Sequence, residues 1–194
     1  NSHNDHDENV SAAVSGGNDN ASGRLSVSYQ RYGGWYDGNG DEVIIDNTQT
    51  GLQYSDRIDV MGTGTINIDD HQQLQLTTQY YKSESDGKHG LYLGKNFSAV
   101  TGDATAYNKN NLDSDRIPGT ERHLINLQYS NTDFWGQDLV AQIYYRDESL
   151  TYYPFPTLSK GTVTSIGASQ QKTDFYGGKL TLNSKPVDDL TLTW

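Results

Sequence analysis

Two alternating runs between Arg57 and Ser83, joined by the polar turn Asp69–His71, constrain the fold most. In the first run, apolar residues and glycines take every second position, with mostly polar residues between them. A period of two places one set on each face of a β-strand. Each run has roughly ten residues, enough for a tilted strand to cross a bilayer, whereas a soluble strand has about five or six. The pair predicts two neighbouring strands of a membrane sheet.

The rest of the chain repeats this unit, and short turns alternate with long connections. That rhythm is typical of outer-membrane barrels, whose extracellular loops are long. We therefore predict an all-β fold, an antiparallel transmembrane β-barrel segment of about eight strands. The stretch Leu91–Leu93 is too short to be predicted as structured. The further strands are expected at residues 9–17, 24–32, 120–130, 138–153, 174–185 and from 190, and the long connections at 33–56, 84–119 and 154–173.

Composition excludes several classes of function. The chain has 194 residues, a formal net charge of −11 and no cysteine. The absence of cysteine excludes disulfides and thiolate metal sites. The acidic balance argues against nucleic acid as a partner, because nucleic acid requires clustered Lys and Arg. No apolar run is long enough for a transmembrane helix.

Several stretches resemble the TonB-dependent outer-membrane siderophore receptors. They are SGRLSVSYQRYGGWYDGNGD, DNTQTGLQYSDRIDVMGTGT, LQLTTQYYKS, LDSDRIPGTERHLINLQYS and YYRDESLTYYPFP. The resemblance implies a plugged barrel of about 22 strands, of which residues 1–194 supply only a part, without the plug domain and the remaining barrel.

The resemblance also implies the function and the partners. It implies uptake of a ferric hydroxamate siderophore such as ferric aerobactin, energised through TonB and the plug, in the outer membrane of a Gram-negative bacterium. Outer-membrane lipid would surround the strands, and bacteriocins could exploit the same surface. Iron is expected only within the bound ferric siderophore. No resident cofactor, metal site or catalytic residue is expected.

Basic and aromatic residues near the strand ends on the long-loop side are the candidate ligand-binding residues. Arg meets carboxylates bidentately, and aromatic faces pack against a ligand such as a ferric hydroxamate–citrate complex. In the alternative interpretation, the aromatic residues form a membrane-interface girdle and each Arg pairs with a carboxylate such as Asp56, Asp115 or Asp147. The candidates are Trp35, Tyr36, Arg57, Tyr81, Lys82, Arg116 and Arg146.

Two further motifs favour no metal. Asp37, Asn39 and Asp41 have the spacing of a calcium loop, but Glu42 replaces its required glycine and Thr48 its terminal Glu. We interpret this segment as an acidic surface loop. The second motif is interpreted as a solvated loop rather than a zinc or nickel site; it comprises His3, His6, Asp5 and Asp7.

Two other classes of function stay open at this point. An outer-membrane enzyme, such as a surface protease or phospholipase, would need carboxylates or a Ser–His pair converging on one rim. The chain has no G-x-S-x-G motif to mark such a nucleophile. A secreted β-rich adhesive or carbohydrate-binding module would instead fold without detergent and bury its apolar strand faces.

Overall fold

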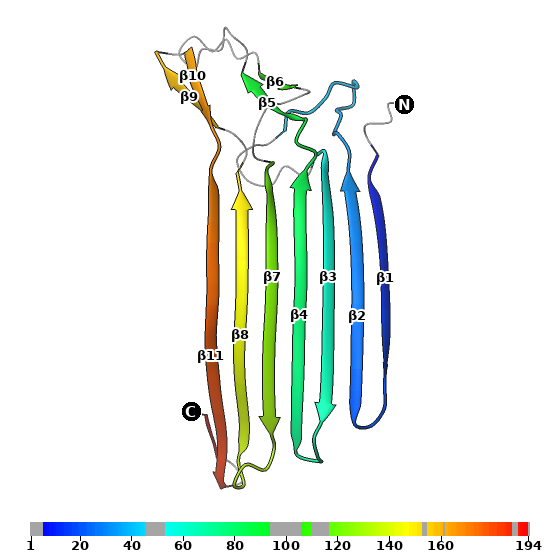
Figure 1. The fold of residues 1–194 in the computed structure, drawn as a ribbon, viewed down its shortest axis with the longest axis vertical. Coiled ribbons are helices and arrows are strands. Elements are labelled where there is room, and N and C mark those ends of the chain that lie inside the picture. The colour runs from blue at the N-terminus through cyan, green and yellow to red at the C-terminus, as the bar shows by residue number, and fades with distance from the viewer. Residues whose placement is uncertain are drawn as a thin grey trace.

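The computed structural model describes residues 6–45, 53–93, 106–109, 117–152, 155–160, 162–187 and 190–193. Eight strands form one antiparallel sheet whose order follows the sequence, and the described sheet is open at both edges (Figure 1). Short turns lie at one end of the sheet and long connections at the other. The strands are β1 (Glu8–Gly17), β2 (Ala21–Tyr32), β3 (Ser55–Asn67), β4 (Gln72–Ser85), β7 (Gly119–Asn131), β8 (Asp138–Thr151), β11 (Gln170–Val187) and β12 (Leu190–Thr193).

The all-β prediction and the eight-stranded sheet are confirmed, but the long connections hold more structure than predicted. Leu91–Leu93 belongs to β5 (Gly90–Leu93), which pairs with β6 (Ala106–Lys109). A second hairpin joins β9 (Phe155–Ser159) to β10 (Thr162–Gly167). Both hairpins lie at the long-connection end (Figure 1). Strands this short are stabilised by their partner strand, and alternation within one segment does not reveal that partner.

The boundaries of β11 also correct the prediction. The strand begins at Gln170 rather than Asp174 and continues past Pro186, where a turn was expected. Proline has no amide to donate, so within a sheet it is tolerated at bulges and edges. The β11–β12 register shifts between Ser184 and Val187, next to this proline.

Side-chain oxygens close two of the short turns. Asn18 Oδ1 accepts hydrogen bonds from the amides of Asn20 and Ala21. Asp69 Oδ1 accepts hydrogen bonds from the amides of His71 and Gln72. The hydrogen bond from the His71 amide is the main reason that the pKa of the Asp69 carboxyl is lowered. Asn and Asp at these positions favour tight turns because they mimic a backbone turn.

The two faces of the sheet reverse the burial pattern of a soluble protein. Large apolar side chains on one face are exposed: Val14 by 67%, Ile143 by 62% and Leu180 by 69%. The opposite face carries mainly polar residues, and many of them are half-buried against one another. A continuous exposed apolar face of this extent is typical of contact with lipid or another protein. Within the described residues, no helix is long and apolar enough to span a membrane.

The upper border of the apolar face runs obliquely across the strands. Ile58 marks this border on β3, and the register places Lys172 of β11 directly in line with it. On β11 the border is marked by Tyr176, which lies four residues closer to the short turns than Lys172. Four residues across four strand spacings correspond to a strand tilt of about 35° from the normal to that border. Membrane barrels tilt their strands by roughly 35–45°.

Adjacent residues on β4 test this assignment of faces. In a lipid bilayer, Leu76→Arg is expected to destabilise the full-length protein by about 2–4 kcal/mol, because the charge would lie among acyl chains. Gln75→Arg, the matched control on the polar face, is expected to cost far less. Denaturant unfolding in bilayers measures both changes. Equal destabilisation by the two substitutions would contradict the assignment.

Candidate ligand-binding site

A belt of arginine and aromatic side chains crosses the polar face near the long-connection end. The Arg57 guanidinium lies 5.7 Å from the ring centroid of Tyr32 and 5.8 Å from that of Tyr81. The Arg122 guanidinium lies 5.6 Å from the ring centroid of the same Tyr81. The belt is defined here as Tyr32, Arg57, Tyr81, Arg122, Glu148, Arg146 and Phe175.

Sheet register brings the belt together from six strands. Tyr81 is directly opposite Arg122, and Arg122 is opposite Glu148. Arg146 is opposite Phe175, whose ring centroid lies 5.0 Å from the guanidinium. Directly opposed side chains in antiparallel strands lie on the same face and within contact distance. Residues far apart in the sequence therefore form one continuous surface.

The belt follows the slope of the apolar face. In line with Arg57 on β11 is Gln171, whereas the belt residue of β11 is Phe175, four residues closer to the short turns. This offset equals the one between Ile58 and Tyr176 on the opposite face. The belt therefore keeps a constant level relative to the upper border of the apolar face, as a ring of ligand contacts inside a tilted barrel would.

The three belt arginines differ in their partners. Arg122 Nε donates to Glu148 Oε2 over 2.6 Å. Arg57 donates only to the neutral amide oxygen of Gln30, at 3.3 Å, and its Nε is buried without an acceptor among the described residues. Arg146 Nε is buried and unpaired in the same way. A buried donor without an acceptor carries a desolvation cost that an added acceptor removes.

The structure brings together three of the residues singled out by sequence, namely Arg57, Tyr81 and Arg146. Lys82 lies on the opposite face, where it pairs with Glu84. Arg116 lies outside the described residues. Of the carboxylates considered as alternative partners, Asp115 lies outside the described residues. Asp56 pairs with Arg31 on the apolar side of the sheet, and no ion pair joins Arg146 to Asp147, which lies on the opposite face.

Sequence reasoning did not select Tyr32, Arg122, Glu148 and Phe175 as site residues. Arg122 and Glu148 lie on the polar phase of their strands, so alternation assigns them to the same face as Tyr81. Alternation within one strand does not give the register between strands. Without that register, nothing in the sequence indicates that these residues meet.

Trp35 and Tyr36 lie in the connection after β2 rather than in the belt. The Trp35 amide donates to Gln53 Oε1, and its side chain is 44% exposed. Tyr36 forms an isolated bridge with Glu42. Their position at the long-connection end follows the prediction, and the described contacts join them to a second cluster above the belt.

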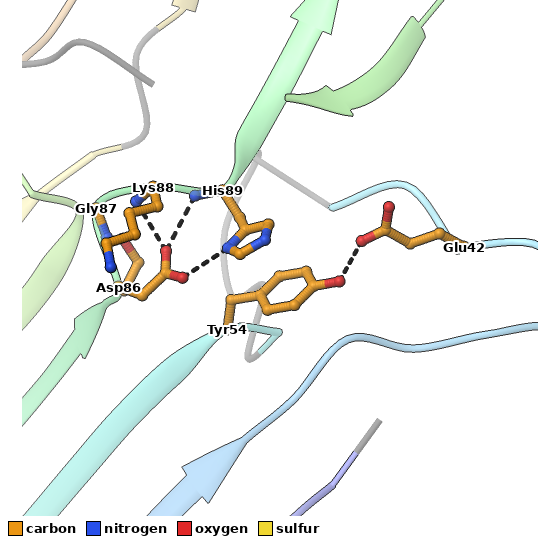
Figure 2. Close-up of polar contacts among 7 residues, drawn as sticks. Glu42, Tyr54, Asp86, Gly87, Lys88 and His89 are labelled. Carbon is orange, nitrogen blue, oxygen red and sulfur yellow. Dashed lines mark hydrogen bonds and ion pairs between the residues drawn. The ribbon is translucent and has the colours of Figure 1, made fainter. Parts of the chain in front are cut away.

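This second cluster, the loop clamp, comprises Glu42, Tyr54, Asp86 and His89. Figure 2 shows the Tyr54 ring stacked on His89, with centroids 3.7 Å apart and planes inclined by 10°. His89 Nδ1 lies 2.6 Å from Asp86 Oδ2, and the Tyr54 hydroxyl donates to Glu42. The clamp joins the connection after β2 to the connection after β4.

The clamp adjoins the tightly packed part of the described structure. Ile45 and Gln53 are only 1% and 2% exposed. Tyr54 has a left-handed backbone, with φ of 53°, which is rare for a bulky residue. Burial, followed by the hydrogen bond to Glu42, raises the pKa of the Tyr54 hydroxyl well above its ordinary value. The phenol therefore stays protonated and continues to donate to Glu42 throughout the physiological pH range.

Asp37 of the acidic motif and His6 of the histidine motif make contacts close to their own positions in the chain. Asp37 Oδ1 accepts hydrogen bonds from the amides of Asn39 and Asp41, so it closes its own turn. His6 lies 3.2 Å from Glu8. His3 and Asp5 lie outside the described residues. Where the structure is described, no three His, Asp or Glu side chains are grouped to hold a metal ion.

The fold and the belt define the class of protein. Its members have a tilted antiparallel sheet with an apolar face on one side and a cationic, aromatic-rich polar face on the other. The sequence of the chain is similar to those of ferric aerobactin and rhizobactin receptors. It is 65% identical to the ferric aerobactin receptor of Klebsiella pneumoniae and 64% identical to that of Escherichia coli, over 191 residues in each case. The rhizobactin receptor of Rhizobium meliloti (strain 1021) is 36% identical over 191 residues.

These relatives are much longer than the chain. The matches cover 98% of this chain and 26% of each relative, so the chain spans about a quarter of their length. No protein-family model matches the chain, and no solved structure matches it.

Two glycines of the same loop test the clamp. A Cβ at Gly34 would collide with the Tyr54 ring, whereas one at Gly38 would meet nothing within 4 Å. Gly34→Ala is therefore expected to displace Tyr54 from His89, at a cost of about 1–3 kcal/mol. Gly38→Ala is the matched control. Limited proteolysis of the full-length protein should show faster cleavage near residue 54 only for Gly34→Ala, and equal cleavage rates would contradict the packing.

Proposed function

We propose that this chain is part of an outer-membrane β-barrel receptor that takes up a ferric siderophore, with the belt as part of its binding surface. The ligand proposed is a ferric hydroxamate bearing carboxylates, of which ferric aerobactin is the example named by two relatives. The observation that carries the proposal is the set of guanidinium groups stacked on aromatic rings across the polar face.

The chemistry of the belt matches such a ligand. Three arginines and one carboxylate leave the belt with a net positive charge, and guanidinium groups bind carboxylates through paired N–H donors. Aromatic rings hold the guanidinium groups in place without neutralising their charge. They also offer flat apolar surfaces to the organic part of a chelate.

The proposed activity is binding and transport, with no change in covalent bonds. The relatives are named as receptors and not as enzymes, and on this proposal the full-length protein is a receptor as well. Iron enters only as the ferric complex, and energy for its release inward reaches the barrel through TonB. The apolar face would contact the lipid of a Gram-negative outer membrane. Neither the enzyme nor the secreted-module alternative is favoured by a contact in the described chain.

Neighbouring tyrosines on β4 separate the two faces in a binding assay. Tyr81→Ala removes the ring between Arg57 and Arg122, and we expect it to weaken ferric aerobactin binding by about tenfold, or about 1.4 kcal/mol. Tyr80→Ala, on the opposite face, is expected to leave binding unchanged. Fluorescence titration of the full-length receptor in detergent gives both dissociation constants. If the unmodified receptor binds no ferric aerobactin, the proposed ligand is wrong.

A further inference from the structure

We infer that Arg57 and Arg146 are the two belt groups that receive anionic oxygens of the ligand, whereas Glu148 is a built-in counter-ion that reserves Arg122 for positioning Tyr81. The inference rests on the proposed function and deepens it. It assigns different roles to three arginines that look equivalent in the sequence.

Arg122 is already satisfied within the chain. Its Nε donates to Glu148 Oε2 over 2.6 Å, and its guanidinium lies 5.6 Å from the Tyr81 ring centroid. The two residues are directly opposed on neighbouring strands, so the ion pair is set by the register. A ligand carboxylate at Arg122 would have to displace the half-buried carboxylate of Glu148, which belongs to the same chain and so pays no entropic cost of association. Arg122 therefore fixes the Tyr81 ring rather than the ligand.

Arg57 and Arg146 lack such a counter-ion among the residues that the structure describes. Each is stacked beside an aromatic ring, Tyr32 and Tyr81 for Arg57 and Phe175 for Arg146. In each, Nε is buried and has no acceptor. Ring contacts fix the direction of a guanidinium and leave its N–H donors free. An anionic oxygen from a ligand would accept charge-assisted hydrogen bonds from the remaining Nη N–H groups of each guanidinium.

The separation of the two groups indicates the class of ligand. Arg57 and Arg146 lie on β3 and β8, three strand spacings apart, and are offset by four residues along the strands. On a flat sheet their Cα atoms would lie roughly 20 Å apart, and closer on a curved one. One carboxylate cannot bridge that span. The ligand that satisfies both arginines is a chelate with at least two separated anionic groups, such as a ferric complex built on a polycarboxylate.

Neutral substitutions in the full-length receptor, titrated with ferric aerobactin in detergent, test the assignment. Arg57→Gln and Arg146→Gln are each expected to weaken binding roughly 10- to 100-fold, the loss typical of a hydrogen bond to a charged group. Arg57→Lys and Arg146→Lys should recover part of that loss because they retain the charge. Arg24→Gln is the matched control, since Arg24 lies on the polar face beside Thr63, six residues along β3 from Arg57. It should bind as the unmodified receptor does.

The pair Arg122 and Glu148 gives the decisive comparison. Arg122→Gln leaves Glu148 uncompensated and should weaken binding of the anionic ligand. Glu148→Gln frees Arg122 and should bind at least as tightly as the unmodified receptor. The double variant R122Q/E148Q removes both charges and should recover the part of the loss caused by the uncompensated Glu148, but not the part caused by the loss of Arg122 beside Tyr81.

The results that overturn the inference differ from those that overturn the proposed function. The inference is wrong if Arg57→Gln and Arg146→Gln bind normally, or if Glu148→Gln loses affinity as Arg122→Gln does. A receptor that binds no ferric aerobactin before any substitution overturns the proposed function instead. A folded barrel changes its electrophoretic mobility when the sample is heated, so a variant whose mobility does not change on heating has failed to fold. Where a Gln variant fails to fold, the Lys variant at the same position decides the outcome. The inference requires that this Lys variant retain more affinity than any Gln variant that folds.

Discussion

The hydrogen-bonded ladder between antiparallel strands is the constraint on which the rest of the structure depends. Its two-residue period assigns every side chain to one of two faces, and the register is continuous from β1 to β11. A slip of one residue in any strand would move its polar side chains to the apolar face. The same ladder therefore fixes the lipid-compatible surface and aligns the arginines of the belt.

The described sheet has few buried residues of its own. The closely packed residues lie at the long-connection end, around Ile45, Gln53 and Tyr54. Along most of their length the strands have no layer packed against the apolar face, and β1 and β12 each have one unpaired edge in the described sheet. Unpaired backbone groups are costly in an apolar environment, and closure of a barrel removes them. The fold is thus consistent with a portion of a larger closed sheet.

The sequence predicts the parts of this structure that depend on one strand at a time. Alternation from Arg57 to Ser83 correctly predicts the strands, the turn at Asp69 and the two faces. The relation between strands is set by many weak cross-strand contacts, which no single segment encodes. For that reason Arg122 and Glu148 were missed, and Lys82 was grouped with Arg57 although their side chains lie on opposite faces. The β5–β6 hairpin was missed for the same reason.

The distribution of charge explains how a chain with a net charge of −11 can present a cationic surface. Several cations are neutralised by adjacent acids on the apolar side, as in the pairs Arg31–Asp56 and Lys82–Glu84. In the belt, aromatic rings take the place of most counter-ions. A ring orients a guanidinium through its quadrupole and leaves the charge intact, whereas a carboxylate cancels it. The belt therefore retains positive charge, and screening limits the reach of that charge to about 8–10 Å at physiological ionic strength. A surface of this kind acts on an anionic ligand at short range and offers no charge-assisted hydrogen bond between opposite charges to a neutral ligand of the same shape.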